Sequence, residues 1–172
     1  ANVDWHEIII KRLKGMGFEY KDFMFHGGIR DEFKAKDIPI RAEFRKKMHR
    51  VDSKAQFMVT RLTTPPPSGA SLEQIDKAGL LEFFKVWIVA SGAKAEEFKY
   101  FRNHNRTVWA YRCNLNMQTR SILDYYRFFP WFGYMKNLDG VAYWTFNGAK
   151  GNDGFDHRDG YDDGIDLLGM DR

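Results

Sequence analysis

Cysteine is nearly absent from this chain, since Cys113 is the only one among 172 residues. A single cysteine excludes an internal disulfide and a zinc cage built from cysteines, so we interpret Cys113 as a buried thiol. The sequence also has no run of the roughly 20 apolar residues that a membrane-spanning helix needs. These absences argue against a protein stabilised by internal disulfides and against one with membrane-spanning helices. We expect no membrane partner.

Patterns that bind metal ions are missing as well. The aspartates between residues 153 and 166 do not follow the calcium-loop pattern and lack its terminal glutamate. No serine stands in a nucleophile elbow. The histidines that show no zinc-site spacing are His26, His49, His104 and His157. We therefore expect neither a metal ion nor another cofactor.

Charge of one sign is not in large excess, because 27 Lys and Arg against 23 Asp and Glu give a formal net charge of +4. Between Arg41 and Arg50 the basic residues alternate with Phe44 and Met48 at helical spacing, which favours a solvated helix face. Acidic residues are interspersed along the chain, so we expect no nucleic-acid partner. Nucleic-acid binding through basic and aromatic residues is the least favoured alternative.

Apolar residues make up 44% of the chain and aromatic residues 16%. Their periodicity predicts helices at residues 5–16, 40–51, 93–103 and 118–138, the last interrupted near Pro130. It predicts strands at residues 22–27, 55–60, 84–90, 107–113 and 140–146. Ser71 and Gln74 have the spacing of a capping box ahead of a further short helix.

This alternation of strand and helix predicts an α/β fold with a parallel sheet. Spacing alone leaves two architectures open, a doubly wound sheet or part of an eight-stranded barrel. A closed barrel needs about 250 residues, so we expect the chain to supply only part of one. Residues 1–147 are the predicted barrel portion, and the Gly- and Asp-rich residues 148–172 are a predicted long loop or the start of a following segment.

Two adjacent carboxylates, Asp31 and Glu32, follow the apolar run at residues 23–28. Strands of a parallel sheet are buried on both faces, and ligands bind at their C-terminal ends. A carboxylate pair at such an end suits acid-assisted glycosidic chemistry, whereas two solvated loop acids are the simpler alternative. The pair is therefore the candidate enzyme site.

The order of these features resembles the catalytic barrel of glycoside hydrolase family 123, the bacterial β-N-acetylgalactosaminidases, over residues 5–147. The segments that carry the resemblance are Asp31-Glu32, the helix end at 46–52, Lys-Val-Trp-Ile-Val at 85–89, Val-Trp-Ala-Tyr-Arg-Cys at 108–113, Arg127 with Trp131, and Asp-Gly-Val-Ala-Tyr-Trp at 139–144. Phe33 stands where the family often has proline, and the first three barrel strands are absent. Placed this way, the chain supplies about strands four to eight of a (β/α)8 TIM-type barrel.

The resemblance implies a glycoside hydrolase that releases terminal β-linked N-acetylgalactosamine by a substrate-assisted retaining mechanism. Glu32 is the implied acid and base, and Asp31 is the implied partner of the sugar's 2-acetamido group. The implied substrate-binding residues are Trp109, Tyr111, Tyr143, Trp144, Arg127 and Asn147. Strand alternation puts Tyr143 and Trp144 on opposite faces, so only part of this set can line one pocket, and Tyr111 and Trp144 are favoured.

Arg127 is either a buried partner of a site carboxylate or a side chain that reaches solvent. The expected partners are a carbohydrate substrate and the remainder of the barrel or a complementing chain, and we expect this segment to be inactive alone. The resemblance implies a periplasmic or extracellular location. A non-catalytic carbohydrate-binding or structural segment is the first alternative. A β-hexosaminidase acting on N-acetylglucosamine is another, since His26-Gly27-Gly28 is similar to part of that family's motif.

Overall fold

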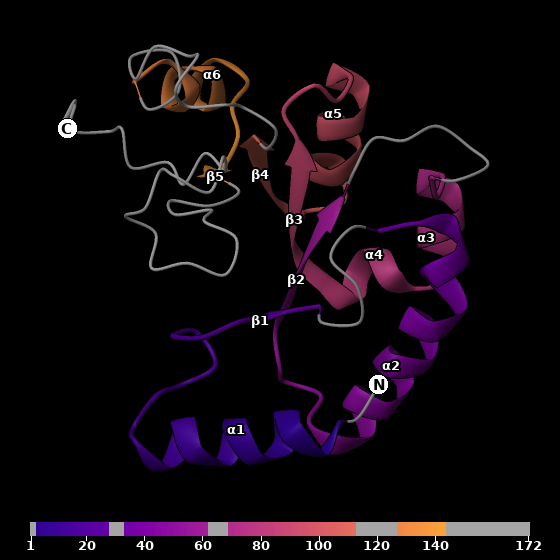
Figure 1. Cartoon of the computed structure of the whole chain (residues 1–172), viewed down its shortest axis with the longest axis vertical. Coiled ribbons are helices and arrows are strands. Elements are labelled where there is room, and N and C mark those ends of the chain that lie inside the picture. Colours follow the sequence, from indigo (N-terminus) through magenta and orange to yellow (C-terminus); the bar gives the residue numbers. More distant parts are fainter. Residues whose placement is uncertain (1–2, 28–32, 62–68, 113–126, 144–172) are drawn as a thin grey trace, which may run out of the picture. The chain divides into compact units, whose positions relative to one another are not determined.

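The computed structural model describes residues 3–27, 33–61, 69–112 and 127–143 (Figure 1). The chain separates into two compact units, Ala1–Val108 and Trp109–Arg172. The elements of the first unit are α1 (Asp4–Gly15), β1 (Phe25–His26), a 3-10 turn (Ala35–Asp37), α2 (Ile38–Val51), β2 (Phe57–Arg61), α3 (Leu72–Lys77), α4 (Leu80–Phe83), β3 (Phe84–Ala90) and α5 (Ala95–Asn103). β4 (Thr107–Arg112) begins in this unit and continues into the second, which also contains α6 (Phe129–Met135) and β5 (Gly140–Tyr143).

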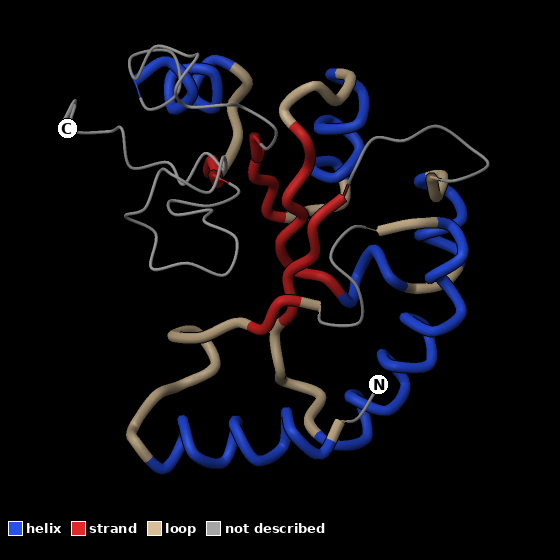
Figure 2. The backbone as a smooth tube through the Cα atoms, viewed as in Figure 1, coloured by secondary structure: helices blue, strands red, loops and turns tan. Residues whose placement is uncertain are grey.

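The described strands form a five-stranded parallel sheet in the order β1-β2-β3-β4-β5, which confirms the predicted α/β class (Figure 2). A doubly wound sheet reverses its strand order at a switch point. No reversal occurs among these strands, because each pairs with the next along the chain. In the first unit, α2, α3, α4 and α5 all lie to the right of β2 and β3 in Figure 1, as crossovers of one hand require.

Element boundaries agree with the sequence best where strands are buried. β3 has the predicted bounds, Phe84–Ala90, and β4 ends one residue before the predicted strand does. The first strand is much shorter than predicted, with Phe25–His26 in place of residues 22–27. Pro130 lies in the first turn of α6, where its missing N–H removes no helical bond. Residues 118–126 of the predicted long helix, Cys113 and residues 148–172 lie outside the described residues.

The first helix does not pack through the large apolar residues whose periodicity predicts it. α1 forms as expected, but Trp5, Ile8 and Met16 are 56%, 54% and 72% exposed, whereas His6 and Ile10 are buried. The His6 ring lies 5.2, 5.3 and 5.7 Å from phenylalanine rings on β1, α2 and β2. The helix therefore packs through an imidazole, which a hydrophobicity pattern counts as polar.

Aromatic rings fill the core of the first unit. The buried Phe57 ring stacks on Phe83 with centroids 4.9 Å apart and meets Phe44 edge-on at 5.4 Å. Trp87 on β3 stacks on Phe101 of α5 at 4.6 Å, and both side chains are fully buried. Such ring pairs contribute roughly 0.5–1.5 kcal/mol each beyond the area they bury. Much of the high aromatic content therefore serves the core.

Helix ends follow the signals that the sequence carries. The capping box is confirmed, since the Gln74 N–H donates to Ser71 Oγ at 3.1 Å and the Ser71 N–H donates to Gln74 Oε1 at 2.9 Å. α1 ends before Gly17, whose φ of 91° suits glycine. Among the residues that the structure describes, no helix is long and apolar enough to cross a membrane.

Candidate functional site

The candidate acids Asp31 and Glu32 lie outside the described residues, but the residues on either side of them are well placed. The Gly27 N–H donates to the Met58 carbonyl at 2.6 Å, and the Phe33 N–H donates to the Thr60 carbonyl at 3.1 Å. The two acceptors are the second and the fourth residues of β2. Gly27 and Phe33, which flank residues 28–32, therefore lie beside β2 after the end of β1, at the edge where parallel α/β folds bind ligands.

Gly27 occupies a position where only glycine fits. A Cβ atom there would lie 2.5 Å from Cε1 of the Phe84 ring and 3.1 Å from the Met58 carbonyl oxygen. Phe84 is fully buried at the start of β3, so its ring has little freedom to move away. The glycine lets the chain cross this ring on its way to the candidate acids.

Arg41 corrects the predicted solvated face of the second helix. Its side chain is fully buried, and Nη1 donates to the Gly27 carbonyl at 3.1 Å. Its guanidinium carbon lies 4.8 Å from the centre of the Phe33 ring, within cation–π range. One buried cation thus holds the residue before and the residue after the segment that carries the acids.

Two further polar pairs stand at the carboxyl ends of β1 and β2. His26 Nε2 lies 3.0 Å from Thr60 Oγ1, joining the last residue of β1 to β2. Arg61, the last residue of β2, forms an ion pair through Nε with Glu97 of α5, and the two side chains are only 6% and 14% exposed. These pairs add hydrogen-bonding and charged groups to the edge that the acids flank.

Arg61 and Gly69, which flank a second segment outside the described residues, 62–68, also lie at this edge. Arg61 Nη1 donates to the carbonyl of Ala70 at 2.9 Å. Lys34 and Gly69 form an antiparallel bridge, which joins the residues that follow the two segments. The carboxyl ends of β1 and β2 therefore share one polar, partly buried surface.

The predicted substrate-binding residues fall in the second unit. Trp109 and Tyr111 lie on β4, where Trp109 is half-buried and Tyr111 is buried. Tyr143 ends β5, at the register position of Arg112 on β4. Arg127 is exposed just before α6. Trp144 and Asn147 lie outside the described residues.

The neighbouring strands bring Tyr111 and Tyr143 to the carboxyl ends of β4 and β5. Asp31 and Glu32, the other members of the predicted site, lie outside the described residues. Their assignment to one pocket therefore stays a prediction.

Sequence reasoning missed Arg41 and Arg61. The signal for Arg41 was present, because Arg41, Phe44 and Met48 fall on one helical face and all three are buried. The predicted strand ended at Thr60, whereas β2 ends one residue later, at Arg61. The prediction therefore did not include Arg61. A charged residue on an apolar face or at the end of a buried strand is a sign of a buried charge that needs partners.

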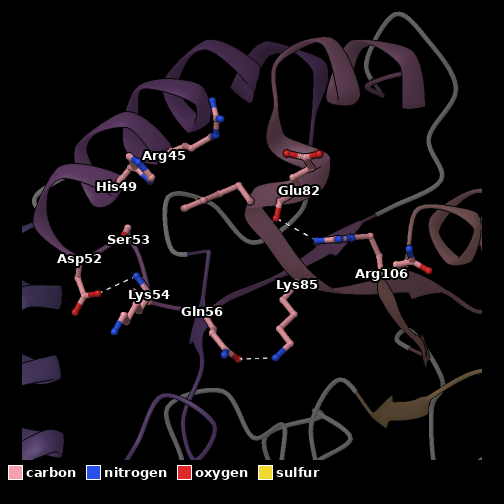
Figure 3. Close-up of a pocket in the computed structure, with 12 residues that line it drawn as sticks. Arg45, His49, Asp52, Ser53, Lys54, Gln56, Glu82, Lys85 and Arg106 are labelled. Carbon is pink, nitrogen blue, oxygen red and sulfur yellow. Dashed lines mark hydrogen bonds between the residues drawn. The ribbon is translucent and has the colours of Figure 1, made fainter.

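One cavity in the first unit lies away from these groups. It has a volume of about 490 Å³ and is lined by residues that precede β2, begin β3 and precede β4, so it opens at the amino edge of the sheet (Figure 3). Within the described ranges, no group of three metal-ligating side chains occurs. Comparison with known protein families, with curated proteins and with solved structures finds no match to this chain.

Proposed function

We propose that this chain is the C-terminal portion of a (β/α)8 barrel that hydrolyses terminal β-linked N-acetylgalactosamine. The parallel strands in sequence order support the barrel, because an eight-stranded barrel is wound in one direction without a switch point. The resemblance of the sequence to glycoside hydrolase family 123 supplies the substrate class.

The observation that carries the proposal is the anchoring of both flanks of residues 28–32 to β2. The hydrogen bonds of Gly27 and Phe33 fix where the segment with Asp31 and Glu32 starts and ends. In barrel enzymes, catalytic groups lie in the segments that follow the strands at this edge. A surface loop without function has no need of a fully buried arginine that holds both of its ends.

In the proposed mechanism Glu32 donates a proton to the glycosidic oxygen as the bond to the anomeric carbon breaks. The oxygen of the sugar's own 2-acetamido group attacks that carbon, so the intermediate is bonded to the substrate and not to the enzyme. Asp31 accepts a hydrogen bond from the acetamide N–H and stabilises the positive charge that develops there. Glu32 then removes a proton from the incoming water, which opens the intermediate with net retention.

Arg41 is a positioning residue in this scheme, because it holds Gly27 and Phe33, the residues on either side of the segment that carries the acids. Its charge also makes this edge of the sheet favourable for carboxylates. Arg61 and Glu97 neutralise each other in a buried pair at the same edge.

The test is hydrolysis of 4-nitrophenyl β-N-acetylgalactosaminide and its glucosaminide counterpart by the complete polypeptide that carries this sequence. Glu32→Gln should lower kcat by about 100- to 10,000-fold, the usual contribution of a general acid–base group. Nitrophenolate is a good leaving group that needs little help from an acid. The loss in kcat should therefore be larger for methyl β-N-acetylgalactosaminide, whose methoxide leaving group needs the proton. Glu43→Gln, an exposed substitution on α2, is the matched control.

Equal turnover by wild type and Glu32→Gln on both leaving groups would overturn the assignment of the acid. Binding of N-acetylgalactosamine without turnover would favour the non-catalytic carbohydrate-binding alternative. Faster turnover of the glucosaminide would move the substrate to N-acetylglucosamine. Asp31→Asn should slow hydrolysis without preventing folding, as judged by circular dichroism.

A further inference from the structure

The cavity at the amino edge of the first unit is rich in positive charge. Its lining includes four side chains that carry a positive charge, Arg45, Lys54, Lys85 and Arg106, and two carboxylates, Asp52 and Glu82. We call this cavity the amino-edge cleft. In the part of the chain that the structure describes, ion pairs occur elsewhere, and none involves these four cations.

Arg106 is oriented by neutral groups. Its Nη1 donates to the Glu82 carbonyl at 3.2 Å and its Nε donates to the His104 carbonyl at 2.9 Å. Figure 3 shows the side chain extending across the cleft toward Glu82. Backbone carbonyls fix the guanidinium without cancelling its charge, which leaves further N–H donors for a ligand.

Arg45 and Lys85 are also held by uncharged neighbours. The Arg45 guanidinium packs against Gly79, where a Cβ atom would lie only 2.9 Å from Nη1. Lys85 Nζ donates to the side-chain oxygen of Gln56 at 3.1 Å. Positive charges in fixed positions lose little conformational entropy when an anion binds.

Of the two acids, Asp52 already serves the fold. Its Oδ2 accepts a hydrogen bond from the Tyr20 hydroxyl at 2.5 Å, and its Oδ1 accepts one from the Lys54 N–H at 2.9 Å. These bonds occupy both carboxylate oxygens. Asp52 keeps its charge, but four cations and two carboxylates still leave the lining with a net charge of +2.

We propose that the amino-edge cleft binds a phosphorylated small molecule of about sugar-phosphate size. Arginine and lysine side chains are the usual phosphate ligands of proteins, and the fork of an arginine can donate two hydrogen bonds to one phosphate. The cavity volume of about 490 Å³ lies within the range of small-molecule sites. Phe83 also lines the cleft and offers an apolar surface to the rest of the ligand.

This site is separate from the proposed glycosidase site, because the two lie at opposite ends of β2. The proposal does not depend on the proposed function. A protein that hydrolyses no glycoside can still bind a phosphate ester at the amino-edge cleft.

The experiment is isothermal titration calorimetry of the full chain with glucose 6-phosphate, and with glucose as the neutral partner. Glucose 6-phosphate should bind saturably at one site, and glucose should not. Arg106→Gln and Lys85→Gln should each weaken binding by about tenfold or more, since each removes a charged hydrogen-bond donor. Lys46→Gln on α2 is the matched control, because it removes one charge from an exposed side chain outside the cleft.

Two variants are needed because Arg106 also holds a turn, whereas Lys85 is an exposed strand residue that can be changed without loss of core packing. Equal weakening by Lys46→Gln would show attraction by net charge alone and overturn the proposal. Binding of glucose as tight as that of its phosphate, or no binding by the wild type, would overturn it too. So would binding of RNA or an acidic peptide in the absence of any binding of glucose 6-phosphate.

Discussion

At the residue scale, Arg41 is the side chain on which the candidate active site depends most. It is the fully buried cation of α2, and it touches both flanks of the segment that carries Asp31 and Glu32. A buried arginine costs desolvation free energy unless its donors are used, so its contacts matter to folding as well as to the site.

Replacing Arg41 by methionine should lower the free energy of unfolding by about 2 kcal/mol, because the Gly27 carbonyl loses its donor inside the protein. Urea denaturation followed by tryptophan fluorescence measures the change. Lys46→Met, at an exposed position of the same helix, should change stability by less than about 0.5 kcal/mol. Similar losses for the two variants would contradict a structural role for Arg41.

At the element scale, the turn between α5 and β4 determines where Arg106 enters the amino-edge cleft. Asn105 has a φ of 55°, and its N–H donates to the Arg102 carbonyl at 2.9 Å. The Arg106 N–H donates to the Phe101 carbonyl at 3.0 Å, which completes a Schellman motif. Asn137 ends α6 in the same way, with a φ of 52°.

Asn105→Ile should destabilise the protein by about 1–2 kcal/mol, because a β-branched side chain is strained in the left-handed conformation. Asn105→Gly should leave stability nearly unchanged, since glycine adopts that conformation freely. Thermal unfolding of both variants tests the pair. If Asn105→Gly were as unstable as Asn105→Ile, the side chain of Asn105 and not its backbone conformation would be the cause.

At the scale of the whole molecule, stability should fall at alkaline pH through two tyrosines. The hydrogen bond to Asp52, and then burial, raise the pKa of Tyr20 above its ordinary value of 10.0. Burial, and then the charges of Asp76 and Glu73, raise the pKa of Tyr100. A raised pKa in the folded state means that the folded protein binds the proton more tightly than the unfolded chain does.

The contribution of these tyrosines is therefore complete below pH 10 and is lost as the pH rises through their folded pKa values. Tyr20→Phe should make the free energy of unfolding fall less steeply above pH 10 than it does in the wild type, by removing one of the two groups. Chemical denaturation at several pH values above 10 gives the slope of the free energy of unfolding against pH for each protein. Tyr134→Phe, which removes the hydroxyl of a side chain that is 77% exposed, is the control. Identical slopes for wild type and Tyr20→Phe would contradict the prediction.

Local rules were enough to propose the candidate acids and to predict one helix start. The order of Asp31 and Glu32 after an apolar run and the capping box at Ser71 can be recognised in the sequence, because each depends on residues that are close along the chain. What local rules missed is the set of partners. Arg41 contacts Gly27 and Phe33, and Arg61 contacts Glu97. These partners are separated along the sequence and come together only in the folded protein.

The sequence by itself determined the alternation of strand and helix and hence the parallel α/β class, because buried strands and amphipathic helices leave distinct periodicities. Only the tertiary structure showed that the described strands pair in sequence order without a reversal, since strand order depends on how distant segments pair. The tertiary structure also decided which face of α1 is buried, and that Arg41 is the buried arginine of α2. Burial depends on what lies opposite each face, and a helical pattern does not contain that information.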